Sequence, residues 1–118
     1  MIDHPATLLT EPKISYLLHE LETVLMLNGA VAEFGVYSGG SAYIIATFLS
    51  VNAPGKRLHL FDSFAGLPAK GPMDGEEYLN CQGWYQSDYE DIRKHFSRFP
   101  DVMIHPGMFA DIIAIDCD

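Results

Sequence analysis

Short, largely apolar segments alternate with helical patterns along this chain, and this alternation restricts its fold more than any other feature. Residues 30–36, 57–62, 102–105 and 112–116 are rich in apolar and β-branched residues, as buried strands are. Residues 42–51 are apolar nearly all round, which suits a helix packed against a sheet. Strands separated by helices require right-handed crossovers and therefore predict an α/β fold. We expect a three-layer, Rossmann-like parallel sheet, with helices on both faces and strands buried on both sides.

Two amphipathic patterns predict further helices. Residues 11–29 begin with a Glu-Pro pair, which the first turn of a helix tolerates, and finish with an Asn-Gly pair that can cap its end. From Tyr85 to Phe99, aromatic and aliphatic residues recur at steps of 4, 3, 4 and 3, before Pro100 stops the pattern. The apolar positions of the two helices, which we expect to face the core, are Ile14, Leu17, Leu18, Leu21 and Leu25, then Tyr85, Tyr89, Ile92, Phe96 and Phe99.

The size and charge of the chain exclude several classes of protein. Its 118 residues have the length of one domain, which we place over residues 1–118. Seven basic and 16 acidic residues give a net charge of −9, and a field of that sign repels phosphates. We therefore expect no nucleic-acid partner and no membrane partner, since no apolar run approaches the roughly 20 residues of a membrane helix. The sequence begins without the features of a signal peptide, and Cys81 and Cys117 form no disulfide framework, which predicts a cytoplasmic protein with free thiols.

A glycine-rich turn, residues 33–41, follows the first predicted strand. Ligands of parallel α/β sheets bind at the carboxyl ends of the strands, where this turn lies. Gly35 allows a sharp turn, the following helix offers free amide groups, and the carboxylate of Glu33 suits an ammonium group better than a phosphate. The segment lacks the spacing of a phosphate-binding loop or of a dinucleotide-binding turn. A glycine turn of purely structural use remains the alternative.

Three aspartates end other predicted strands. Asp62, 27 residues after Gly35, stands where nucleoside-binding sheets hold ribose hydroxyls, although a turn or capping aspartate is the alternative. Asp116 and Asp118 point to the same side of the last strand and are able to hold a hard cation such as magnesium, unless they are simply a solvated acidic end. His105 is also at a strand end and is a weaker candidate for the site.

The remaining residues with reactive side chains have simpler explanations. Cys117 lacks a paired histidine nearby in sequence and is interpreted as a small buried apolar residue. His59 lies inside an apolar strand and is interpreted as a core histidine. The connection after Asp62 is long for a compact domain, with no clear period over residues 63–84, and such loops are usually functional lids or disordered.

Several segments of the chain match one known family, in the same order. Together they resemble the macrocin O-methyltransferase (TylF-like) family, whose members are class I enzymes dependent on S-adenosylmethionine. The DSFxGLP segment is the most specific of them. The matching segments are residues 33–41 (EFGVYSGGS), 61–68 (FDSFAGLP), 107–109 (GMF) and 115–118 (IDCD).

The resemblance implies a function and a set of site residues. It implies the class I methyltransferase fold, with this chain as its N-terminal, cofactor-binding half, and methyl transfer from S-adenosylmethionine to a hydroxyl of a small molecule of the sugar or natural-product type. It implies Asp116 as the catalytic residue and a magnesium ligand, Asp118 as a second ligand, and residues 65–84 as a lid over the acceptor. The cofactor-binding residues that it implies are Glu33, Gly35, Tyr37, Gly39, Ser41, Asp62, Ser63, Gly107, Met108 and Phe109.

Members of that family are longer than this chain and continue with a helix and further strands. The resemblance therefore leaves three explanations open: a fragment, a chain that completes its fold with a second copy or another chain, and a binding module without turnover. The apolar run over residues 112–115 would lie at a sheet edge, which favours a homo-oligomer. The alternatives to the methyltransferase are thus a non-catalytic cofactor- or nucleoside-binding module and an α/β interaction protein.

Overall fold

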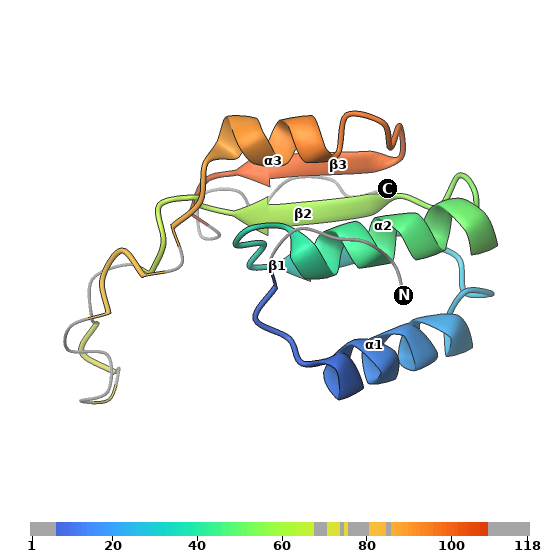
Figure 1. Cartoon of the computed structure of the whole chain (residues 1–118), viewed down its shortest axis with the longest axis horizontal. Coiled ribbons are helices and arrows are strands. Elements are labelled where there is room, and N and C mark those ends of the chain that lie inside the picture. The colour runs from blue at the N-terminus through green and yellow to red at the C-terminus, as the bar shows by residue number, and fades with distance from the viewer. Residues whose placement is uncertain (1–6, 68–70, 74, 76–80, 85, 109–118) are drawn as a thin grey trace.

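The computed structural model describes residues 7–67, 71–73, 75, 81–84 and 86–108. Its centre is a three-stranded sheet in the order β1-β2-β3, in which β2 pairs in parallel with both neighbours (Figure 1). The parallel α/β fold predicted from the sequence is confirmed. The strands are β1 (Val31–Phe34), β2 (Leu58–Asp62) and β3 (Val102–Pro106).

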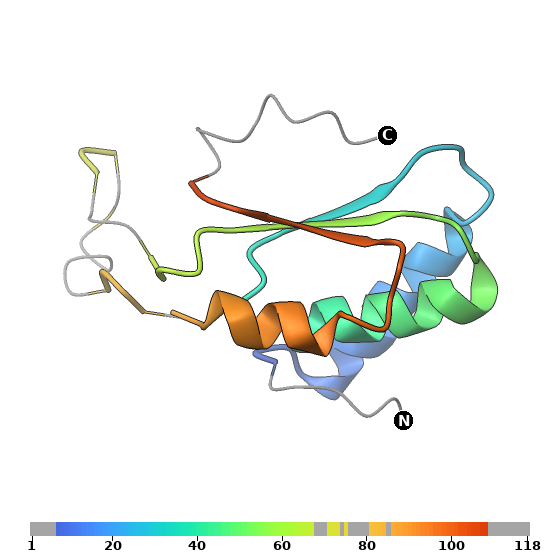
Figure 2. The same ribbon diagram turned by 90° about the horizontal axis from the view of Figure 1, so that it is seen from above.

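The helices of the described residues all lie on one side of the sheet, as Figure 2 shows. They are α1 (Glu11–Thr23), α2 (Gly40–Asn52) and α3 (Tyr89–His95). Helix α2 joins β1 to β2, α3 precedes β3, and α1 packs against α2. Helices for the opposite face are not found among these residues, and the strand predicted at residues 112–116 lies outside them. None of the helices in the described part of the chain has the length and apolarity needed to cross a membrane.

The core fills the space between the sheet and the helices. Leu58 and Leu60 of β2 point into it with 1% and 0% of their surface exposed. Small residues of α2, such as Ala42 and Ala46, let this helix approach the sheet closely. The other buried members of this cluster are Leu21, Val36, Ile45, Leu49, Phe64, Ile92 and Phe96.

The opposite face of the sheet is less well covered, which corrects one prediction. The structure buries the first four residues of β2 on both sides, but β1 and β3 alternate between partly buried and exposed residues. Phe34 is 60% exposed and Met103 is 37% exposed, because the helices of the described residues lie on the other side of the sheet. On this face the ring of Phe61 stacks between those of Phe34 and His105, with centroid distances of 4.8 and 4.6 Å.

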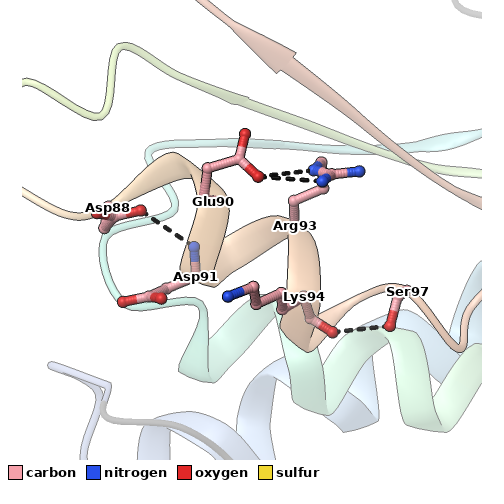
Figure 3. Close-up of polar contacts among 6 residues, drawn as sticks. All are labelled: Asp88, Glu90, Asp91, Arg93, Lys94 and Ser97. Atoms are coloured by element: carbon pink, nitrogen blue, oxygen red, sulfur yellow. Dashed lines mark hydrogen bonds and ion pairs between the residues drawn. The ribbon is translucent and has the colours of Figure 1, made fainter.

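Helix α3 is shorter than the sequence pattern predicts. Asp88 caps its N-terminus by accepting a hydrogen bond from the Asp91 amide at 3.1 Å (Figure 3), so the helix begins after Asp88. Tyr85, the first position of the predicted pattern, lies outside the described residues. Ile92 and Phe96 of the predicted apolar stripe are buried in the core, as expected. Phe99 packs against the core from the turn that follows the helix.

The end of α1 also differs from the prediction. The helix stops at Thr23, whereas the Asn-Gly pair at residues 28–29 was expected to end it. Val24 and Leu27 donate hydrogen bonds to carbonyl groups three residues earlier, at Leu21 and Val24. These tighter turns replace the last helical turn and carry the chain towards β1.

Candidate cofactor site

The carboxyl ends of the strands meet at one edge of the sheet and surround a hollow of about 180 Å³. Parallel strands place the segments that follow them side by side, so residues far apart in sequence share this edge. The residues that line the hollow are Phe34, Gly35, Phe61, Asp62, Ser63, Gly66, Gly107 and Met108.

Asp62 joins the segments that follow all of the described strands. Its Oδ2 accepts hydrogen bonds from the amides of Val36 at 2.7 Å and Tyr37 at 3.0 Å, both in the turn after β1. Its Oδ1 accepts from the amide of Phe64 at 3.0 Å, and its carbonyl oxygen accepts from Gly107 at 3.0 Å. The turn-aspartate interpretation is therefore confirmed. A carboxylate has about four acceptor positions, and amides of the described residues occupy three of those on the Asp62 side chain.

The glycines of the turn after β1 have different roles. Gly35 has φ +90°, lines the hollow, and would place a Cβ in open space, with nothing within 4 Å. Gly39 has φ +87° and precedes α2, but a Cβ there would lie 3.2 Å from Phe96 and 3.4 Å from Ile92. Gly39 therefore makes room for the side chains of α3, whereas Gly35 leaves main chain accessible at the hollow.

Glu33 and Ser41 form a pair on the helix-facing side of β1, outside the lining of the hollow. The Ser41 hydroxyl donates to Oε1 of Glu33 at 3.2 Å, with Oε2 at 3.4 Å. Burial raises the pKa of Glu33 from 4.5 to about 7, and the hydrogen bond from Ser41 opposes this only in part. This carboxyl is thus able to exchange a proton near neutral pH.

The segment after Asp62 is fixed by its own side chains. The Ser63 hydroxyl accepts from the Ala65 amide at 3.2 Å and donates to the Gly66 carbonyl at 3.4 Å. Phe64 has φ +61°, a conformation that is costly for a bulky residue. It is held there by the Asp62 carboxylate and by its ring, which is 6% exposed and lies in the core. The DSFxG part of the motif is therefore a compact turn, in which each residue type has a structural cause.

Two histidines, His59 and His105, form a pair next to the ring of Phe61. His59 is 3% exposed, and its Nδ1 lies 2.9 Å from Nε2 of His105. The Nε2 atom of His59 is buried without a hydrogen-bond partner in the described structure. Burial, and secondly the charge of His59, lower the pKa of His105 below 6.5. His59 is buried as the sequence suggests, whereas His105 does not line the hollow.

The structure brings together only part of the predicted site. The predicted residues that line the hollow are Gly35, Asp62, Ser63, Gly107 and Met108. Those that lie outside its lining are Glu33, Tyr37, Gly39 and Ser41. Phe109, Asp116 and Asp118 are outside the described residues. Among the residues that the structure describes, no group of three or more His, Cys, Asp or Glu side chains is able to hold a metal.

Sequence reasoning did not assign Phe34, Phe61 and Gly66 to the site. Phe34 and Phe61 are register partners near the carboxyl ends of neighbouring strands, on the face away from the helices. The alternation of residues along a strand is the signal that could have identified them, once the pairing of β1 with β2 was assumed. Gly66 stands within the DSFxGLP segment, but its place depends on a contact with a distant part of the chain.

A parallel sheet with a hollow, a glycine turn and an aspartate at its carboxyl edge defines the class of open α/β domains that bind ligands there. The family model described as macrocin-O-methyltransferase (TylF) matches residues 5–116. The chain belongs to this family. A search of curated proteins found no match.

Two solved structures are similar to this chain and show its fold. One is the O-methyltransferase NovP, with a TM-score of 0.75 and 20% sequence identity, over 89% of this chain and 48% of that one. The other is CalS11, a calicheamicin methyltransferase, with a TM-score of 0.64 and 17% identity, over 86% of this chain and 49% of that one. The chain thus spans about half the length of these structures.

Proposed function

We propose that this chain supplies the cofactor-binding part of an S-adenosylmethionine-dependent O-methyltransferase, which acts on a hydroxyl group of a small molecule of the sugar or natural-product type. The observation that carries the proposal is the hollow at the carboxyl edge, where Gly35 and Asp62 meet in a chain of the TylF family. A cytoplasmic location and a homo-oligomer are parts of the same proposal.

The residues around the hollow fit the nucleoside part of the cofactor. Asp62 retains acceptor capacity for a ribose hydroxyl, and Gly35 allows a ligand to approach the main chain. Phe61 and Met108 add apolar walls suited to a planar base. The hollow is smaller than the roughly 300–1,000 Å³ of most ligand pockets, which agrees with a site formed in part by these residues.

The chemistry of the reaction divides between the cofactor and the protein. Bound S-adenosylmethionine supplies a methyl group already activated on a sulfonium. The protein aligns this donor with the acceptor and keeps water away, and alignment alone contributes much of the rate. Asp62 and Gly35 would hold the donor, and residues 65–84 would cover the acceptor. Asp116 would assist at the acceptor hydroxyl, with Asp118 as a second oxygen ligand for magnesium.

Calorimetric titration of the purified chain tests the proposal. We expect both S-adenosylmethionine and S-adenosylhomocysteine to bind, with and without magnesium. Asp62→Ala removes the acceptors of the turn and of the ligand, and should weaken binding by about 1.5–3 kcal/mol. Asp101→Ala is the matched control, because Asp101 also accepts from a backbone amide, that of Gly55 at 3.1 Å, but at the opposite ends of the strands.

The outcome separates the possible functions. If the folded chain binds neither nucleoside, the cofactor-binding proposal is wrong and an α/β interaction protein is favoured. If it binds both, but transfers no methyl group to any hydroxyl acceptor, the chain is a non-catalytic binding module. Equal affinities for the Asp62→Ala and Asp101→Ala variants would remove Asp62 from the site.

A further inference from the structure

The segment between β2 and α3 is closed at its base by backbone hydrogen bonds. The Leu67 amide donates to the Trp84 carbonyl at 2.8 Å, and the Gly83 amide donates to the Leu67 carbonyl at 2.8 Å. We call the four residues Gly66, Leu67, Gly83 and Trp84 the neck. In Figure 1 its two arms lie beyond the carboxyl end of β2, on the way from that strand to α3.

Gly66 allows the two arms of the neck to approach each other. It has φ +81°, and a Cβ at this position would clash with the backbone of Gly83 and lie 2.6 Å from the carbonyl oxygen of Trp84. Because these are backbone atoms, no rotation of a side chain relieves the clash. Gly83 has nearly the same conformation, with φ +83°, but a Cβ there meets nothing within 4 Å. An alanine would therefore meet similar backbone strain at both positions, but only at position 66 would its Cβ also clash with backbone atoms.

The neck is continuous with the wall of the hollow. Gly66 lines the hollow together with Ser63, and the Ser63 hydroxyl donates to the Gly66 carbonyl at 3.4 Å. Asp62, the residue before Ser63, accepts a hydrogen bond from the Phe64 amide at 3.0 Å. A third backbone hydrogen bond links the residues that flank the neck, from the Ser87 amide to the Phe64 carbonyl at 3.3 Å. A displacement of the returning arm is therefore transmitted through Gly66 to the residues that face the ligand.

We propose that the neck positions one wall of the cofactor site, and that Gly66 is the positioning residue, because its close contact with the Gly83–Trp84 backbone sets where Ser63 and Asp62 face the hollow. This inference rests on the proposed cofactor binding and extends it to a device that links the pocket to the segment between β2 and α3. Gly66 acts through its neighbours and needs no contact with the reacting atoms.

The matched glycines provide the test. Gly66→Ala should weaken binding of S-adenosylhomocysteine about tenfold, since overpacking against backbone displaces the wall, whereas Gly83→Ala should change the affinity by less than about threefold. Both variants are measured at a temperature where circular dichroism shows them fully folded, so that the shared strain of an alanine at positive φ cancels. Equal affinities of the two variants would overturn the proposal.

Hydrogen exchange of the unmodified chain gives a second test, which does not depend on the variants folding. Saturating S-adenosylhomocysteine should slow exchange of the Leu67 and Gly83 amides, which close the neck, and leave unchanged the Gly55 amide at the opposite ends of the strands. Binding without any change at Leu67 and Gly83 would overturn the role of the neck while leaving the cofactor proposal intact. Absence of binding by the unmodified chain would overturn the cofactor proposal, and the neck proposal with it.

Discussion

The two faces of the sheet differ in what covers them and in what they contribute. The face towards the helices buries Leu58 and Leu60 almost completely, and it joins β2 to α2 and α3 in one cluster. The opposite face exposes Phe34 and Met103 in part, yet its aromatic rings reach the hollow at the strand ends. The comparison indicates that one face supplies most of the stability, whereas the other supplies part of the wall of the hollow.

The largest expected effect is a loss of stability when a core side chain on the helix-facing side of the sheet is shortened. Leu60→Ala removes a side chain with no exposed surface from the helix-facing side, and should lower the free energy of unfolding by about 2–5 kcal/mol. Met103→Ala, on the other face, should cost less than about 1 kcal/mol, because that side chain is 37% exposed. Urea unfolding followed by circular dichroism measures both. Similar losses for the two variants would mean that both faces support the fold equally.

The titration of Glu33 tests how the helix-facing side of the sheet contributes to stability at different pH values. Glu33 is the register partner of Leu60 on this side. Its pKa is about 7 in the folded chain against 4.5 ordinarily, so the folded state binds the proton more tightly. The contribution of Glu33 to stability should therefore be most favourable below pH 4.5 and fall as the pH rises towards 7, by up to about 3 kcal/mol. Glu33→Gln should remove this loss.

The measurement for Glu33 is the difference in unfolding free energy between the variant and the unmodified chain at pH 4.5 and pH 8. We expect the variant to gain stability relative to the unmodified chain as the pH rises. Glu22→Gln, at an exposed position of α1, is the control for removing a carboxylate. A difference that does not depend on pH would show that burial does not raise the pKa of Glu33 in the folded chain.

His105, on the opposite face, should respond to pH in the other direction and by less, because its ring remains partly exposed. Its folded pKa lies below 6.5, so the unfolded chain takes up the proton more readily. Stability is lost as the pH falls below 6.5. His105→Gln should reduce this loss in urea unfolding series from pH 7 to pH 5, whereas His19→Gln, exposed on α1, should not. An unchanged acid slope in His105→Gln would exclude His105 as its source.

The sequence determines the sheet more fully than the site. The apolar segments of β1, β2 and β3 predict a parallel sheet because crossover helices and buried strands permit little else. How far helices cover each face of the sheet was not predictable, since it depends on the side of the sheet on which each crossover helix packs. The helix limits differ because local turns and the Asp88 cap compete with the apolar pattern.

The site shows the same limit for single residues. Gly35 and Asp62 were predictable because their places at strand ends follow from the order of the elements. The packing of Gly39 against Phe96 and the contact of Gly66 with Gly83 depend on distant segments, and no local pattern encodes such contacts. The same glycine signal therefore marks the lining of the hollow at Gly35 and helix packing at Gly39.

The contacts of Asp62 have a consequence for when the hollow forms during folding. The partner amides on Val36 and Gly107 lie far from Asp62 in sequence, on either side of it, so their contacts close long loops. Such non-local contacts form late and slow the folding of a domain. The hollow therefore cannot exist while β1 or β3 is undocked from β2. During refolding, nucleoside binding should appear at the same time as the last strand docks onto the sheet. The rate at which binding appears would then report on completion of the sheet.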